Sequence, residues 1–135
     1  MSGEADLHRL LAGMAPVLDP VTYVFATTSD RAHPARAHAL MIMAEDAGLT
    51  LILPQAHATP DLTPVFPCRR ITLTIHSALS AVGLMAAVSA ALAQAGIGCN
   101  PVAGYYHDHL FVPADRSADA MAAIITLTGQ QEGGR

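Results

Sequence analysis

The chain has 135 residues, of which 52% are hydrophobic and 13% charged, a balance that excludes a disordered protein. It has no lysine and a formal net charge of -4, so no basic face is available to a nucleic acid. No apolar run reaches the roughly 18 residues that a membrane helix requires, so no membrane partner is expected. The polar, acidic start resembles neither a secretory signal nor a transit peptide, which predicts a cytoplasmic protein.

The first half combines one short helix with three strands. Apolar residues recur at helical spacing over residues 7–14, and a β-branched, aromatic run over residues 22–28 predicts a strand. The runs 37–44 and 49–53 flank a turn that ends at Gly48, which predicts an antiparallel hairpin.

The segment from residue 54 to residue 67 is predicted to join two halves. Its prolines limit any helix to about one or two turns, started by Thr59 as cap and Pro60 as first residue. We therefore divide the chain into residues 1–66 and 67–129, followed by a disordered tail over residues 130–135.

The second half predicts the order strand, helix, strand, strand, helix. Aliphatic residues alternate over residues 71–75, and a helix is expected from Ser80 as cap to about residue 95, with Gly96 as its stop. Its inner stripe is predicted to hold Val82, Met85, Ser89, Leu92 and Gly96. The runs 98–106 and 109–113 predict a second hairpin.

The last helix is predicted to start at Ser117 as cap and to stop at Gly129, with an apolar stripe of Met121, Ile124, Ile125 and Thr128. This order predicts an α+β, ferredoxin-like module in which two helices cover one face of an antiparallel sheet. The usual last strand is missing, and a strand of the first half can replace it. The expected core contains Leu73, Ile75, Val82, Leu92, Leu110 and Ile124.

Four runs of the second half resemble small bacterial proteins built from paired ACT modules: 70–77 (RITLTIHS), 81–83 (AVG), 95–101 (AGIGCNP) and 106–113 (YHDHLFVP). In the first half, the runs 23–25 (YVF) and 48–54 (GLTLILP) are similar to the partner module. The helix usual between the first two strands is absent there, so this ACT-like module is incomplete. The resemblance implies a non-enzymatic sensor that binds an amino acid or a related metabolite and acts on a separate protein. A homo-oligomer is also expected, through the sheet edges or the open sheet faces.

The resemblance implies a ligand site at the turn between the first strand of the second module and its helix. Free backbone NH groups at a helix start suit a carboxylate. The residues assigned to this site are Ser77, Ala81, Val82, Gly83, Asn100 and Pro101. Alternatively, Gly83 only permits close packing of the helix on the sheet. Gly83→Val is expected to abolish binding at a modest cost in stability.

Histidines 107 and 109 flank Asp108 in the predicted turn of the second hairpin, and His76 is the nearest further imidazole. These residues are assigned to ligand binding, to an interface or to stabilisation of the turn. Two imidazoles without a third ligand argue against a metal site, and no cofactor is expected.

Catalysis is not expected, because His76 and Ser77 are consecutive in a strand and point to opposite faces. Cys68 and Cys99 are interpreted as small apolar side chains. Two alternatives to the sensor remain: a structural interaction module that has lost its ligand, and a small metal-dependent enzyme that uses His76, His107 and His109.

Overall fold

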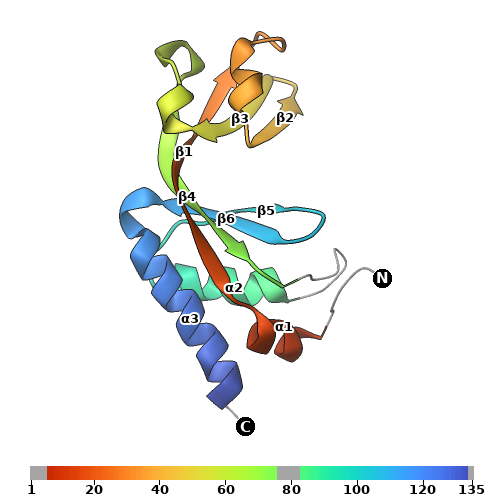
Figure 1. Ribbon diagram of the computed structural model, residues 1–135, viewed down its shortest axis with the longest axis vertical. Helices are drawn as coiled ribbons and strands as arrows, with labels where there is room; N and C mark the ends of the chain where they lie inside the picture. Colours follow the sequence, from red (N-terminus) through yellow and green to blue (C-terminus); the bar gives the residue numbers. More distant parts are fainter. Residues whose placement is uncertain (1–5, 76–82, 134–135) are drawn as a thin grey trace. The chain divides into compact units, whose positions relative to one another are not determined.

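The computed structural model describes residues 6–75 and 83–133, which fold into two compact units (Figure 1). The C-terminal unit consists of Met1–Asp19 and Arg69–Arg135, and the central unit of Pro20–Cys68. These units differ from the division predicted at residue 66, because α1 and the first residues of β1 pack with the second half of the chain.

The C-terminal unit has the strand order β1-β4-β6-β5. It contains the first residues of β1 (Pro16–Thr28), the last residues of β4 (Val65–Leu73), and the whole of β5 (Asn100–Ala103) and β6 (Asp108–Pro113). The Thr74 backbone NH donates to the Ala15 carbonyl oxygen over 3.0 Å at the end of the β1–β4 pair. A strand of the first half therefore does complete the ferredoxin-like sheet.

Three helices share one core with this sheet: α1 (Leu7–Gly13), α2 (Leu84–Gln94) and α3 (Ser117–Gly133). Of the expected core residues, Leu73, Leu92, Leu110 and Ile124 are fully buried in it, and Ile75 packs against its edge. Val82 lies outside the described residues. The core also contains Leu10, Leu11, Met14, Ile71, Leu84, Val88, Ile97, Val112 and Ala120.

Helix α2 ends as predicted. The Ile97 NH donates to the Leu92 carbonyl and the Gly96 NH to the Ala93 carbonyl, with Gly96 at φ +72°, which is a Schellman motif. Its inner stripe is displaced from the predicted one. Leu84, Val88 and Leu92 are buried, whereas Met85 and Ser89 are only half-buried. The predicted cap Ser80 lies outside the described residues.

Helix α3 departs from the prediction at both ends. A 3-10 turn, η4 (Ala114–Arg116), leads directly into it, and the Ser117 hydroxyl donates to the Ala114 carbonyl instead of accepting from the first turn. The helix passes Gly129, the predicted stop, and ends at Gly133. Ile125 is 53% exposed, so its predicted place on the inner stripe is wrong.

The central unit has the strand order β2-β3-β1-β4, which includes β2 (Met41–Glu45) and β3 (Gly48–Pro54). The predicted hairpin is present, with Glu45 opposite Gly48. It starts later than predicted, because the 3-10 turn η1 (Pro34–His38) precedes it. A separate apolar core holds Val24, Ala26, Ala35, Leu49, Leu51, Leu53 and Leu62.

The segment expected to join two halves contains η2 (Gln55–His57) and η3 (Pro60–Leu62), and β4 already begins within it at Val65. Thr59 is the N-cap of η3 and Pro60 its first residue, as predicted, although the Thr59 hydroxyl bonds the Asp61 carboxylate. In the part of the chain that the structure describes, no helix is long and apolar enough to cross a membrane.

Candidate functional site

Helix α2 starts with unpaired backbone NH groups. Gly83 is its N-cap, and the first helical bond runs from the Ala87 NH to the Gly83 carbonyl, so the NH groups of Leu84, Met85 and Ala86 have no acceptor within the helix. Among the described residues, no side chain caps them. Gly83 adopts φ +104°, so the helix begins only after it. The backbone NH groups of Ala81 and Val82, which the sequence also assigns to the site, lie outside the described residues.

The close approach that Gly83 permits is made by a side chain of the protein. A Cβ atom at this position would lie 3.2 Å from Cδ2 of Leu7 in α1. Close packing therefore accounts for this glycine at least in part. Gly83→Val would also force a branched residue into the left-handed region, so it would perturb folding and cannot isolate binding as expected from the sequence.

The structure does not bring Asn100 and Pro101 to the start of α2. In the β5–β6 ladder, Asn100 lies opposite Phe111, whereas a hydrogen bond joins Thr72 near the end of β4 to His109 near the start of β6. The end of β4 is therefore level with the β5–β6 turn. Asn100 lies about 10 Å away along the strands. Residues Ser77, Ala81, Val82 and His76 lie outside the described part.

The β5–β6 turn lies at the same end of the sheet as the C-terminal end of β4 (Figure 1). The Gly104 NH donates to the His107 carbonyl over 2.9 Å and closes the turn. The Nδ1 atom of His107 is buried and, among the described residues, has no hydrogen-bond partner. Buried polar atoms are rarely left in this state, so this nitrogen indicates a missing acceptor or donor.

His109 is held by a 2.9 Å hydrogen bond between its Nδ1 atom and the Thr72 hydroxyl. Burial lowers the pKa of His109, and the nearby Arg70 and His107 lower it further, while Asp108 opposes the shift. The folded protein therefore favours the neutral imidazole, which can donate one hydrogen bond and accept another.

No metal cluster is formed by the described residues, in which no three histidine, cysteine or acidic side chains converge. His76, the third ligand considered from the sequence, is outside this part of the chain. Both cysteines are free. The Cys68 thiol donates to the Tyr23 carbonyl over 3.4 Å, and burial raises its pKa to about 12, which fits an inert core residue.

Two groups of charged residues were not singled out from the sequence. In the C-terminal unit, Arg70 forms a 3.0 Å ion pair with Asp19, although its Nε atom remains buried without a partner among the described residues. In the central unit, Arg31 and Arg36 lie on the segment that follows β1. The rarity of basic residues in a lysine-free chain was the signal that could have identified them.

Two family models match the chain, and both are described as ACT domain. The first matches residues 2–69 and the second residues 65–126, so the matched segments lie in tandem. Among curated proteins, none matches the chain significantly.

Solved structures give further similarities. A Vibrio cholerae protein of unknown function, described as a possible transport protein, is 37% identical over 90% of this chain and 95% of its own, with a TM-score of 0.81. An Agrobacterium tumefaciens protein is 20% identical over 85% and 89% of the two chains, with a TM-score of 0.74. The regulatory subunit of aspartate kinase from Thermus thermophilus shares the fold, with 12% identity over 83% and 95% of the chains and a TM-score of 0.60.

Proposed function

Because this chain belongs to the ACT-domain family and carries two ACT modules in tandem, we propose that it is a non-enzymatic regulatory protein that binds an amino acid or a related metabolite. A regulatory role is supported by the aspartate kinase regulatory subunit that shares its fold. We further propose that the protein acts in the cytoplasm as a homo-oligomer on a separate protein target.

The proposed ligand site is the end of the sheet at which β4 leads into α2. The observation that carries it is the set of NH groups at Leu84, Met85 and Ala86, which have no partner within residues 6–75 and 83–133 and where the helix dipole favours an anion. The ligand carboxylate would accept from these groups. Ser77, Ala81, Val82 and Gly83 are proposed as further ligand-binding residues.

The β5–β6 turn supplies the opposite wall of the proposed site. The His107 Nδ1 atom, which has no hydrogen-bond partner among the described residues, would form a hydrogen bond with a polar group of the ligand. Asp108 and His109 are proposed to line the same wall. A neutral His109 can form a hydrogen bond with the ligand, and without a positive charge it would not draw the ligand carboxylate away from the NH groups of α2. Asn100 and Pro101 lie too far along the strands to join it.

A thermal-shift screen of the common amino acids, followed by calorimetric titration of each ligand found, tests this function. A ligand present at 100 times its Kd should stabilise the folded protein by about 2.7 kcal/mol. His107→Ala should weaken binding at least about tenfold, because it removes a desolvated hydrogen bond. Tyr105→Ala is the matched control, since Tyr105 lies in the same turn but is 72% exposed.

Two results would contradict the proposal. If no amino acid changes the midpoint, a structural interaction module without a ligand becomes the better account. If a ligand binds His107→Ala and the unaltered protein equally well, the protein is a sensor whose site lies elsewhere. Size-exclusion chromatography with light scattering tests the proposed homo-oligomer.

A further inference from the structure

The segment after β1 in the central unit, residues 29–36, carries all the basic charge of that unit, Arg31 and Arg36. Hydrogen bonds within the segment restrain its backbone. The Ala32 NH donates to Oδ1 of Asp30, and the His33 NH to the Asp30 carbonyl, each over 3.0 Å. The segment is therefore an ordered turn, and its backbone fixes the points from which its side chains project.

His33 fixes the second half of this turn. Its Nδ1 atom accepts a 3.0 Å hydrogen bond from the Ala35 NH, so the ring proton must be on Nε2 in the neutral form. Nε2 then donates to Oδ2 of Asp61 over 2.9 Å. These two hydrogen bonds connect the start of η1 to η3, so the backbone that carries Arg36 is restrained.

Both guanidinium groups are anchored by carbonyl oxygens alone. Nη2 of Arg31 donates to the Glu45 carbonyl over 2.6 Å, and Nη1 of Arg36 donates to the Arg31 carbonyl over 3.2 Å. Neither group pairs with a carboxylate within residues 6–75 and 83–133. A guanidinium has five N–H donors, so most of the donors in each group remain available.

The nearby carboxylates are already engaged by other donors. Asp61 accepts from His33 and Thr59, and these hydrogen bonds lower its pKa, with the Thr59 bond as the larger cause. Glu45 accepts from the Thr50 hydroxyl, and Asp30 from a backbone NH. Among the described residues, neither these carboxylates nor Asp46 form an ion pair with Arg31 or Arg36, although the central unit carries four acidic side chains against two arginines.

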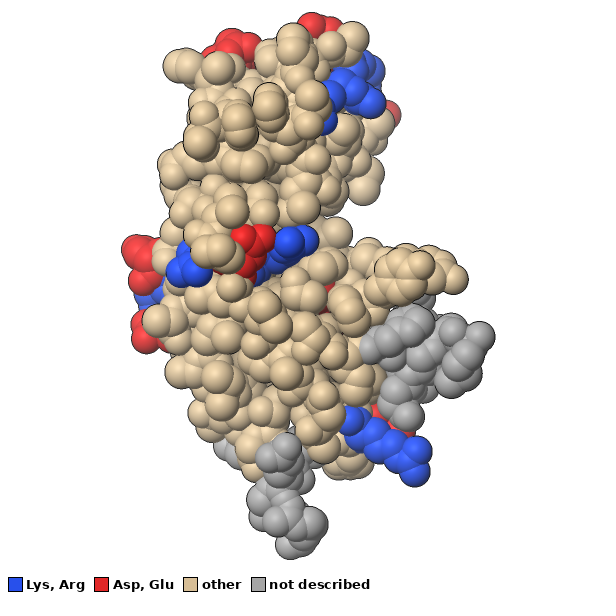
Figure 2. Space-filling model, in the orientation of Figure 1, with Lys and Arg blue, Asp and Glu red and all other residues tan. Residues whose placement is uncertain are grey.

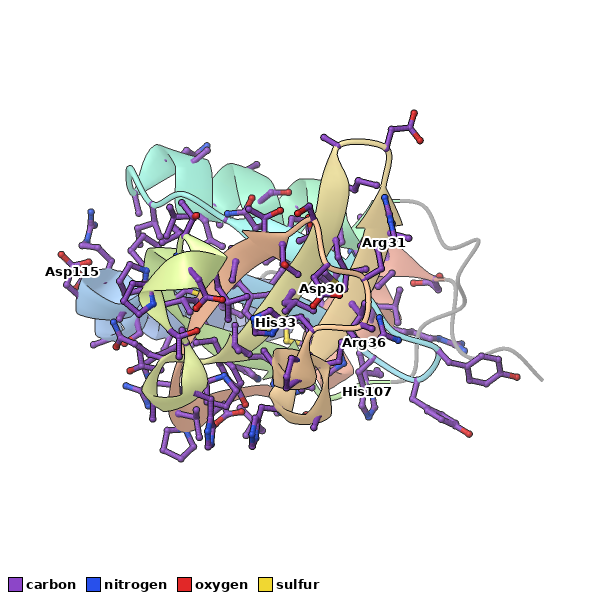
Figure 3. The ribbon with its side chains drawn as sticks, turned by 90° about the horizontal axis from the view of Figure 1, so that it is seen from above. Asp30, Arg31, His33, Arg36, His107 and Asp115 are labelled. Carbon is purple, nitrogen blue, oxygen red and sulfur yellow. The ribbon has the colours of Figure 1, made fainter. Side chains whose placement is uncertain are left out.

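The positions of the two arginines suit one small ligand. Both side chains are exposed, and the bond from Arg36 to the Arg31 backbone keeps them on one side of the turn, near Asp30 and His33 (Figure 3). The basic atoms of the central unit form one patch on its surface (Figure 2). Guanidinium groups bind carboxylates through two parallel N–H···O bonds, so two such groups suit two carboxylates.

We propose that Arg31 and Arg36 form a binding site for a small dicarboxylate anion. Each guanidinium binds one carboxylate of the ligand, and their anchoring carbonyls reduce the side-chain entropy lost on binding. Two basic residues in an acidic, lysine-free chain favour a small anion over a polyanion. The site is separate from the one proposed at α2, so His107→Ala should leave it intact.

Nuclear magnetic resonance titration with succinate at low ionic strength tests this site. Shift changes that saturate are expected at the amides of residues 28–36 and at the Nε–H signals of Arg31 and Arg36. Arg31→Gln and Arg36→Gln should each weaken binding at least about fivefold, and acetate should bind about tenfold more weakly than succinate. Arg116→Gln is the matched control, because Arg116 is paired with Asp119 over 3.0 Å.

Three outcomes would overturn the proposal. The first is equal succinate affinity in the unaltered protein and in Arg31→Gln with Arg36→Gln combined. The second is the same pattern of shifts with sodium chloride at matched ionic strength. The third is saturable binding of inorganic phosphate in the absence of succinate binding. Arg31→Lys keeps the positive charge but loses the paired N–H donors of the guanidinium. This variant should remain folded and bind succinate more weakly than the unaltered protein.

Discussion

Adjacent isoleucines in α3 offer a direct test of how this helix docks. Ile124 is fully buried in the core of the C-terminal unit, and Ile125 is 53% exposed. Replacing each by alanine deletes the same three carbons from the same helix. The two variants differ only in where those carbons lie, so each is the control for the other.

For Ile124→Ala, three buried carbons at about 0.8 kcal/mol each give about 2.4 kcal/mol of lost transfer energy. The cavity adds to this loss, and the better helix propensity of alanine returns about 0.4 kcal/mol. We expect a net loss of about 3 kcal/mol, within the range of about 2 to 5 kcal/mol for such core truncations. Ile125→Ala should change the free energy of unfolding by less than about 0.5 kcal/mol.

Urea denaturation followed by far-ultraviolet circular dichroism measures the difference, since the chain has no tryptophan for fluorescence. With a urea m-value of about 1–3 kcal/mol/M, Ile124→Ala should lower the midpoint by about 1–3 M. Equal losses in the two variants, or a larger loss for Ile125→Ala, would refute the packing of α3 described above.

Leu92→Ala should likewise cost about 2–5 kcal/mol in urea melts, and a loss below about 0.5 kcal/mol would contradict its place in the core. Chelating agents should leave the melting midpoint unchanged. Stoichiometric zinc or manganese in the purified protein, lost when His107 and His109 are replaced together, would contradict the expectation that the protein needs no metal. The pKa of His109 in the folded protein lies below its ordinary value of 6.5, so the unfolded protein binds a proton at this site at a higher pH than the folded protein does. The free energy of unfolding should therefore fall as the pH drops below 6.5, and it should fall less in His109→Gln. Urea melts of both proteins at pH 7.5 and 5.5 measure this difference. Iodoacetamide at pH 8 should leave Cys68 unmodified until urea unfolds the protein, whereas the half-buried Cys99 should react earlier; equal rates in the folded state would contradict the burial of Cys68.

Local rules predicted the elements that depend on a few neighbouring residues. The hairpin between β2 and β3, the stop of α2 at Gly96 and the start of η3 at Pro60 all follow from backbone preferences of glycine and proline. The four-stranded plan of the C-terminal unit also followed from the element order, including the need for a strand from the first half.

The site was less accessible to such rules. The sequence indicated a helix start that could hold a carboxylate. Asn100 was assigned to this site because it lies on the next predicted strand, but the strand register places it at the other end of β5. Arg31 and Arg36 were overlooked, because a charged residue shows its importance only when its neighbours are known. That Glu45 and Asp61 are engaged elsewhere is a property of the folded central unit.

By itself, the sequence indicated the family through the resemblance of its motifs. It also determined the class of fold and most of the helices and strands, because hydrophobic period and turn residues act over short distances. Only the tertiary structure decided that α1 packs with the C-terminal unit, that β1 and β4 pass through both units, and that Ile124 rather than Ile125 faces the core. These outcomes depend on which distant surface each element buries. An amphipathic pattern states that a face must be covered, but the covering partner is chosen by packing among all the elements at once.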